Sequence, residues 1–245
     1  MYQLLTKRLL LFLTLVTVVE ATDWSQIGVT ISGESVNDSS SVVSISGDGT
    51  RIAIGGPGHD AYTGHVRVFE LSNSNWVQIG QDIDGAAVGD NSGAQVWLST
   101  DGNRLAISAP SSNGGGENSG QIRVFELDNG VWVQMGEDLY NSPYSSNPVL
   151  NYDGTSIAIS SQQANGGGNK RGVVKVFQWG LGQWNQIGQD INGEADMDFS
   201  GASLSLNSDG NILAIGAGGN AGNGPWSGHV RVFEWDGGMW MQRGD

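Results

Sequence analysis

Short runs of alternating apolar and polar residues, separated by turn residues, fill the stretch from 92 to 136. An alternation with a period of two predicts β-strands that present their side chains to opposite faces. Asp101-Gly102 predicts a tight turn between the first two runs, because glycine readily adopts a positive φ. The predicted strands are 94–99, 104–108, 121–126 and 132–135.

The same four-strand pattern occurs four times. The second strand of each copy reads Ile-Ala-Ile or Leu-Ala-Ile, beginning at Ile52, Leu105, Ile157 and Leu213. Bulky residues therefore fall on one face and alanine on the other, and the small alanine lets neighbouring sheets approach closely. Four short antiparallel strands per repeat are typical of a β-propeller blade.

A five-residue motif, Trp-x-Gln-x-Gly, marks the fourth strand and sets the repeat. It begins at Trp24, Trp76, Trp132, Trp184 and Trp240, so successive copies are 52, 56, 52 and 56 residues apart. Five motifs accompany only four sets of the first three strands. The chain is therefore either a four-bladed ring with a spare strand or part of a longer array. The sequence favours the longer array, because the chain stops within a repeat without a capping segment.

These patterns predict an all-β fold: a β-propeller of four-stranded antiparallel blades, with four repeats visible, as an open or partial propeller or a closed ring. The gap of seven residues between Phe69 and Trp76 predicts that these aromatic side chains pair across the last hairpin, with Arg67 opposite Gln78. The predicted blades span approximately 41–80, 94–136, 147–188 and 202–244.

The N-terminus predicts a secretory signal peptide, residues 1–21. Lys7 and Arg8 precede an apolar run of eleven residues, Leu9 to Val19, and small residues allow cleavage after Ala21. The run is too short to span a bilayer core, which needs roughly 20 apolar residues. The mature chain, 22–245, is expected to be secreted and extracellular. An uncleaved signal anchor is the alternative.

The charge of the mature chain excludes two classes of partner. The full chain has 11 basic and 25 acidic residues; without Lys7, Arg8 and Glu20 it keeps 9 and 24, a net charge of −15. Nucleic acid and anionic membranes both require a basic face, so neither is an expected partner, and no membrane insertion of the mature chain is expected. Asn37 begins the one Asn-x-Ser/Thr sequon and is the predicted glycosylation site.

The repeats resemble the FG-GAP repeat, the blade unit of the propellers of integrin α-subunits. The matching features are a Gly-rich entry, an Asp-Gly turn, a strand ending near Ala-Pro, a polar loop and Gly-x-x-Arg-Val-Phe, all within 92–127. The resemblance covers Trp24 to the C-terminus and implies an integrin α-like propeller involved in cell adhesion. Calcium-binding repeats of that family carry Asp-x-Asn-x-Asp-Gly. Here no carboxylate lies two or four residues before the turn aspartates Asp48, Asp101, Asp153 and Asp209, so these turns are predicted to be plain hairpins.

A second acidic feature connects the last two blades. Side chains that bear oxygen recur at alternate positions of this loop: Asp190, Asn192, Glu194, Asp196 and Asp198. Such a set is a candidate calcium site, because calcium takes six to eight oxygen ligands. The alternative, which the sequence favours, is a solvated acidic loop with Asx turns. No cofactor is expected; calcium bound at this loop is the alternative.

The residues indicate no catalytic constellation. His65 and His229 share one repeat position, which gives them a structural explanation, and His59 lies in a loop with no serine or cysteine nucleophile assigned to it. The chain is therefore expected not to be an enzyme.

The predicted function is that of a secreted, non-catalytic propeller module for binding or adhesion to an extracellular protein or glycan. The variable loops 56–64, 109–120, 161–172 and 216–228 are expected to gather on one rim, where Tyr62 and Trp226 are candidate ligand-binding residues. The alternatives are a propeller-class carbohydrate-active enzyme and a purely structural repeat fragment of a larger extracellular protein.

Overall fold

The computed structural model describes residues 24–116, 119–140 and 147–244, so the predicted signal peptide lies outside the described residues. Within these residues the fold is all-β, apart from one short helical turn, α1 (His59–Tyr62), in which Asp60 and Ala61 have positive φ values. The described strands form four antiparallel sheets, which we call blades 1 to 4; the first four strands of each are neighbours in chain order, and a fifth strand, where present, pairs with the third. The predicted fold class is confirmed.

Blades 1 and 3 have a short fifth strand. Blade 1 contains β1 (Val42–Ile45), β2 (Arg51–Gly56), β3 (His65–Ser72), β4 (Asn75–Gln78) and β5 (Ile83–Asp84); blade 2 contains β6 (Gln95–Leu98), β7 (Arg104–Ala109), β8 (Gln121–Asp128) and β9 (Val131–Gln134). Blade 3 contains β10 (Asn147–Leu150), β11 (Ser156–Ser161), β12 (Val173–Gly180), β13 (Gln183–Gln186) and β14 (Ile191–Asn192); blade 4 contains β15 (Ser200–Leu206), β16 (Ile212–Ala217), β17 (His229–Trp235) and β18 (Trp240–Arg243).

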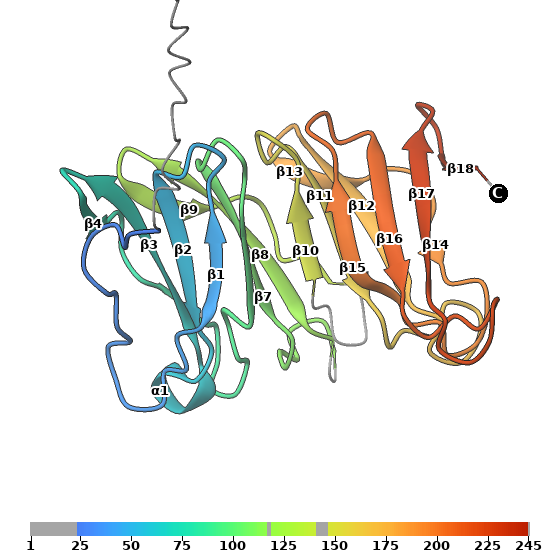
Figure 1. Ribbon diagram of the computed structural model, residues 1–245, viewed down its shortest axis with the longest axis horizontal. Coiled ribbons are helices and arrows are strands. Elements are labelled where there is room, and N and C mark those ends of the chain that lie inside the picture. Colours follow the sequence, from blue (N-terminus) through green and yellow to red (C-terminus); the bar gives the residue numbers. More distant parts are fainter. Residues whose placement is uncertain (1–23, 117–118, 141–146, 245) are drawn as a thin grey trace, which may run out of the picture.

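The blades lie side by side in chain order, with blade 1 and blade 4 at opposite ends of the molecule (Figure 1). Because every blade has the same strand order, its loop between the second and third strands leaves at the same end as the connection to the next blade. These loops form one rim, along the lower edge of Figure 1, where α1 lies.

The register of the last hairpin differs from the prediction by two residues. Phe69 lies opposite Gln78, and Trp76 lies opposite Leu71. The hairpin closes through Asn73 and Ser74, whose φ values of 48° and 63° form a two-residue turn with both residues left-handed. Such turns match the twist of the strands, so the turn fixes the register. The same shift occurs in the other three blades.

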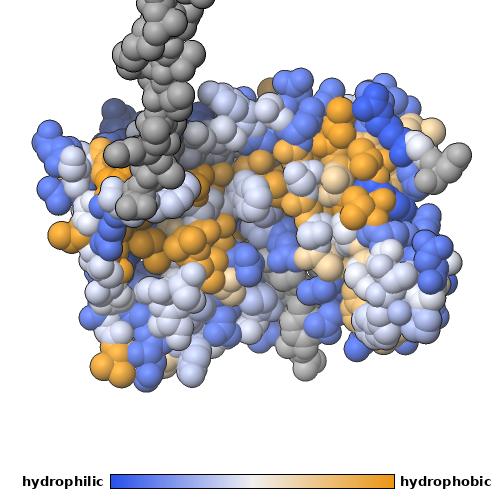
Figure 2. All heavy atoms as spheres, in the orientation of Figure 1, coloured by the Kyte–Doolittle hydropathy of each residue, from blue (hydrophilic) through white to orange (hydrophobic). Residues whose placement is uncertain are grey.

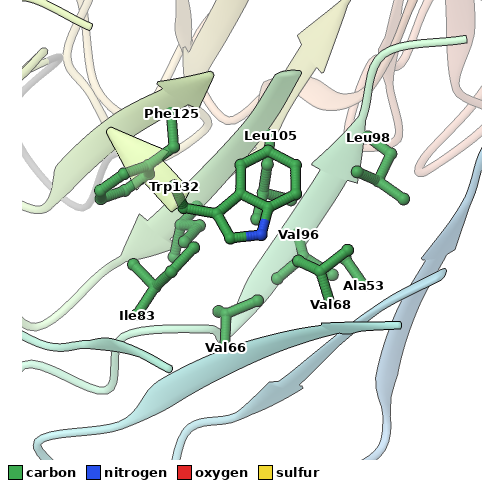
Figure 3. Packing of buried hydrophobic residues seen from close by; sticks show 10 residues of the cluster. Ala53, Val66, Val68, Ile83, Val96, Leu98, Leu105, Phe125 and Trp132 are labelled. Atoms are coloured by element: carbon green, nitrogen blue, oxygen red, sulfur yellow. The ribbon is translucent and has the colours of Figure 1, made fainter. Parts of the chain in front are cut away.

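The core lies between the blades and not within them (Figure 3). Blade 1 contributes the small face of its sheet, including Ala53 and Val68, while blade 2 contributes Leu105, Phe125 and Trp132. The same combination recurs at the two other junctions between blades. The expected segregation of alanine and bulky residues therefore produces close packing of adjacent sheets.

The tryptophan motif links each blade to the chain before it. In each of the last four motifs the tryptophan indole N–H donates to the backbone carbonyl that lies three residues after the tryptophan of the preceding motif. The donors and acceptors are Trp76 to Ile27 (3.1 Å), Trp132 to Ile79 (3.1 Å), Trp184 to Met135 (2.9 Å) and Trp240 to Ile187 (3.2 Å). The recurrence of tryptophan at this position of the motif follows from this contact.

The basic residue of the third strand makes a second link of the same direction. The Nη2 atoms of Arg67, Arg123 and Arg231 donate to the carbonyl oxygens of Ser32, Asp84 and Asn192, at 2.6, 2.6 and 2.7 Å. Each guanidinium also lies 5.2–5.4 Å from the ring centre of the phenylalanine two residues later. These arginines therefore connect each of their blades to the chain before it instead of pairing with the glutamines of their own hairpin.

The first tryptophan motif does not form a spare strand. No residue from 24 to 41 is assigned to a strand, and the Trp24 side chain is fully exposed. Ile27 and Ser32 nevertheless supply the backbone acceptors for Trp76 and Arg67. This N-terminal segment thus occupies, for blade 1, the place that a preceding blade occupies for the others.

Replacing Trp132 by phenylalanine tests the link between blades. The side chain is 2% exposed, so Trp132→Phe removes a buried hydrogen bond and part of the packing. We expect the free energy of unfolding to fall by about 1–3 kcal/mol in urea titrations. Trp24→Phe is the matched control and should change it by less than about 0.5 kcal/mol. Equal effects of the two substitutions would contradict the proposed role of the indole.

Two equivalent glycines test how closely the blades approach. Gly64 and Gly228 have φ values of +76° and +68°, but a Cβ on Gly64 would lie 2.1 Å from the oxygen of Ser92, whereas the nearest atom to one on Gly228 is 3.6 Å away. Gly228→Ala should cost only the left-handed backbone term, about 1–2 kcal/mol. Gly64→Ala should cost at least about 1 kcal/mol more, because backbone must shift. Calorimetry on both variants decides this; similar losses would show that the approach is not limiting.

Candidate functional site

Three of the four blades are each preceded by a connecting segment that a buried aspartate holds together by hydrogen bonds. The Oδ2 atom of Asp38 accepts hydrogen bonds from the backbone N–H groups of Glu34 (2.6 Å) and Ser35 (2.8 Å). Asp90 and Asp198 hold their own loops in the same way, and all three are at most 6% exposed. The corresponding part of blade 3 lies outside the described residues.

The rim loop of each of these blades docks on this aspartate. Its carbonyl oxygen accepts from the N–H of Gly58 in blade 1 (3.1 Å), Ser111 in blade 2 (3.3 Å) and Gly219 in blade 4 (3.0 Å). In blades 1 and 4 the next residue along the chain then lies at the carboxylate. That residue is Asn220 in blade 4, whose Nδ2 is 3.2 Å from Oδ1 of Asp198.

In blade 1 the same position holds a histidine, and a second histidine lies against it. His59 Nδ1 is 2.9 Å from Asp38 Oδ1, and His65 Nε2 is 3.9 Å from Asp38 Oδ2. The two imidazole rings are stacked, with centroids 3.9 Å apart and planes 4° from parallel. His65 is 1% exposed, and its Nδ1 has no hydrogen-bond partner.

The protonation states of this cluster follow from its surroundings. Burial raises the pKa of Asp38, but the N–H groups of Ser35 and Glu34 and the side chain of His59 outweigh it and leave the pKa below its usual value. Burial lowers the pKa of His65, and the charges of His59 and Arg67 lower it further. At neutral pH the carboxyl group is therefore ionised and the buried imidazole is neutral.

A hollow of about 390 Å³ opens beside this cluster on the rim. Tyr62, 60% exposed, stands at its edge, and the chain from 60 to 62 has φ values of 43°, 54° and 66°. Left-handed residues other than glycine persist only where the surroundings hold them. The hollow is lined by Ser35, Val36, Asn37, Gly58, His59, Asp60, Ala61 and Tyr62, so the predicted glycosylation site Asn37 lies on its wall.

The second aromatic candidate lies elsewhere. Trp226 belongs to the rim loop of blade 4, is 67% exposed and stacks on Phe199 with the ring centres 6.0 Å apart. Because blades 1 and 4 lie at opposite ends of the molecule, Tyr62 and Trp226 do not form one site. Figure 2 shows separate apolar patches over these two end blades.

The acidic loop between blades 3 and 4 does not direct its oxygens at one point. Asp190 accepts from Gln186 (2.8 Å), Asp196 pairs with Arg171 (2.9 Å), and Glu194 lies 3.6 Å from His229 and 3.8 Å from Arg231. Asp198 is held by backbone N–H groups, and the main-chain oxygen of Asn192 accepts from Arg231. The four acidic side chains of this loop thus have separate partners in the fold, and Asn192 contributes its main-chain oxygen.

Within the described ranges, two groups of three side chains could hold a metal ion, and both lie at blade 1. They are Asp38 with His59 and His65, and Glu34 with His65 and Asp82. The sequence interpretation missed them because it treated His59 as isolated. One signal was available: His59 precedes Gly64 by five residues, whereas its counterpart Asn220 precedes Gly228 by eight. The shorter loop marks blade 1 as different.

In three of the four Asp-Gly turns the aspartate carboxylate accepts hydrogen bonds from its own turn, whereas in the fourth turn Asn207 accepts the equivalent backbone bonds. Asp48 Oδ1 accepts from Ser46 Oγ (2.6 Å) and from the N–H of Thr50 (2.9 Å), and Asp101 and Asp153 make equivalent bonds. The hydroxyl of Ser46 and the N–H of Thr50 lower the pKa of Asp48 from 3.8 to about 2.

This shift predicts how acid acts on the fold. A carboxyl group whose pKa is lowered on folding stabilises the protein above its unfolded pKa, and that contribution is lost as the pH falls from 3.8 towards 2. We therefore expect the thermal midpoint of the wild type, relative to that of Asp48→Asn, to decline across this interval. A difference between the two proteins that stays constant with pH would contradict the assignment.

Searches against known proteins return only structural matches. No family model matches the sequence, and no curated protein matches it. The solved structures that match include a protein from Bacteroides uniformis ATCC 8492 with a proposed 6-phosphogluconolactonase activity (TM-score 0.55, 14% identity, 82% of this chain and 52% of that one). Two others are hydrazine synthase from Kuenenia stuttgartiensis (0.50, 18%, 79% and 52%) and the β-propeller domain of the Trilobed protease from Pyrococcus furiosus, with an open velcro topology (0.50, 12%, 84% and 57%).

The fold is that of a β-propeller. At these identities the matches show the fold alone, and the chain spans about half the length of the structures it resembles. No helix in the described part of the chain is long and apolar enough to span a membrane.

Proposed function

We propose that the protein is a secreted, non-catalytic β-propeller module that binds an extracellular protein or glycan through the rim of blade 1. The observation that carries the proposal is the hollow beside Tyr62. An exposed aromatic ring stands there beside the polar side chains of Ser35, Asn37 and Asp60. An aromatic face together with a few polar groups suits a sugar ring or a peptide segment.

The backbone of this rim supports a binding role. Residues 60–62 are held in left-handed conformations, so the position of Tyr62 is fixed before a ligand arrives. A preorganised site loses little conformational entropy on binding. Such a rigid loop on a sheet scaffold is a common location for binding residues.

Secretion and adhesion are supported by the sequence. The leader predicted at 1–21 directs export, and the negative net charge suits an extracellular environment. The resemblance of the repeats to FG-GAP blades favours a role like that of other adhesion propellers.

The lining of the hollow between the first strands argues against catalysis. Glycoside hydrolysis requires two carboxyl groups roughly 5–9 Å apart. The hollow between β6, β10 and β15 is lined by residues that include Gln95, Trp97 and Asn147, and none of the lining residues is acidic or a histidine. A carbohydrate-active enzyme would need its acid and base elsewhere.

Glycan and protein arrays probed with the secreted protein test this function. We expect binding that Tyr62→Ala weakens at least about tenfold, since truncating a tyrosine that anchors a binding site costs about 2 kcal/mol or more. Trp226→Ala is the matched control, because it removes an equally exposed aromatic side chain from blade 4. Unchanged binding by Tyr62→Ala would remove blade 1 as the site. Turnover of a polysaccharide would replace the binding module by an enzyme.

A further inference from the structure

We propose that Asp38, His59 and His65 bind a divalent transition-metal ion of the Zn²⁺ class. Their ligating atoms all lie within 4.8 Å of one another. Two imidazoles and one carboxylate suit Zn²⁺ and similar ions, whereas calcium prefers oxygen ligands only. The site is distinct from the Asp-Gly turns and from the acidic loop Asp190–Asp198.

The distances already approach those of a coordination sphere. Donor atoms at about 2.0–2.2 Å from a tetrahedral metal lie roughly 3.3–3.5 Å from one another. His59 Nδ1 and Asp38 Oδ1 are 2.9 Å apart, and His65 Nε2 and Asp38 Oδ2 are 3.9 Å apart. The carboxylate therefore lies close to both imidazoles, at separations near those of ligands on one ion, and the turn of one ring completes the arrangement.

The unpartnered nitrogen of His65 fits a metal ligand. When Nε2 binds a metal, Nδ1 carries the proton, and histidine ligands almost always donate that proton to a carboxylate or carbonyl. His65 Nδ1 is buried without a hydrogen-bond partner, and Glu34 Oε2 lies 3.9 Å from it. With the metal on Nε2, the proton lies on Nδ1, and Glu34 becomes its acceptor once this side chain moves closer.

The backbone makes room for the His65 ring. A Cβ on Gly56 would lie 2.7 Å from the Cδ2 and Nε2 atoms of His65. The residues paired at the same position in the other blades are Ala109, Ser161 and Ala217. Glycine at this position thus leaves space beside the proposed ligand atom in blade 1 alone.

One ring must turn for the metal to bind. An imidazole coordinates in its own plane, so two parallel stacked rings cannot both point at one ion. His59 is the ring that can turn, since its side chain is 24% exposed and it lines the rim hollow. The hollow also gives the ion a path of entry and leaves a coordination position open to solvent.

The other blades lack the complete set at the equivalent positions. The position of His59 is held by Ser112, Ala164 and Asn220, as the hydrogen bonds from Gly120, Gly172 and Gly228 identify. The position of His65 is held by Gln121, Val173 and His229. Blade 4 therefore retains Asp198 and His229 but has an amide where blade 1 has His59.

Titration of Zn²⁺ into metal-free protein tests the site. We expect one zinc ion per chain with micromolar or tighter affinity by calorimetry, and a visible absorption of bound Co²⁺ that is typical of nitrogen ligation. His59→Gln should reduce the affinity at least tenfold while leaving the circular dichroism unchanged, because this side chain is partly exposed. His229→Gln is the matched control and should bind zinc like the wild type.

The outcomes separate this inference from the proposed function. Tyr62→Ala should bind zinc with wild-type affinity even where it has lost its glycan or protein ligand, since Tyr62 contributes no ligand atom. The metal site is overturned if no zinc binds at micromolar concentrations, if His59→Gln binds as tightly as the wild type, or if His229→Gln abolishes binding.

Discussion

The hydrogen bond between a tryptophan indole and a backbone carbonyl of the preceding motif is the contact on which this fold depends. It is made at each of the four junctions, including the one between blade 1 and the N-terminal segment. A buried indole N–H without an acceptor would cost about 1–3 kcal/mol, so each blade is correctly seated only when its neighbour presents that carbonyl. In blades 1, 2 and 4 the arginine of the third strand also donates to a carbonyl earlier in the chain, while its guanidinium lies over the phenylalanine two residues later.

Much of the architecture could be predicted from the sequence because strands have a simple signature. Alternation placed the strands, and the Ile-Ala-Ile pattern indicated which face packs against a neighbour. The hairpin register could not be predicted from the spacing of Phe69 and Trp76, because the left-handed turn at Asn73 and Ser74 decides it. The purpose of the arginines was likewise hidden, since their acceptors lie 31 to 39 residues away in the chain.

The candidate sites were less accessible to sequence reasoning. The loop from Asp190 to Asp198 has a dense set of oxygens, but the fold assigns those side chains to separate partners. The cluster of Asp38, His59 and His65 comes from three separate segments, and it forms because the rim loop docks on the connection before it. Docking of this kind depends on tertiary hydrogen bonds, so spacing along the chain does not reveal it.

Whereas Arg51 and Arg104 on the second strands donate to the following blade, the links made by the motif tryptophans and the third-strand arginines run from a donor in the later blade to an acceptor earlier in the chain. A ribosome releases the chain in that same order. Each motif tryptophan and each third-strand arginine of these links therefore emerges when its acceptor is already made, and the N-terminal segment has supplied the first two. Assembly can proceed one blade at a time during synthesis, with each completed sheet serving as the template for the next.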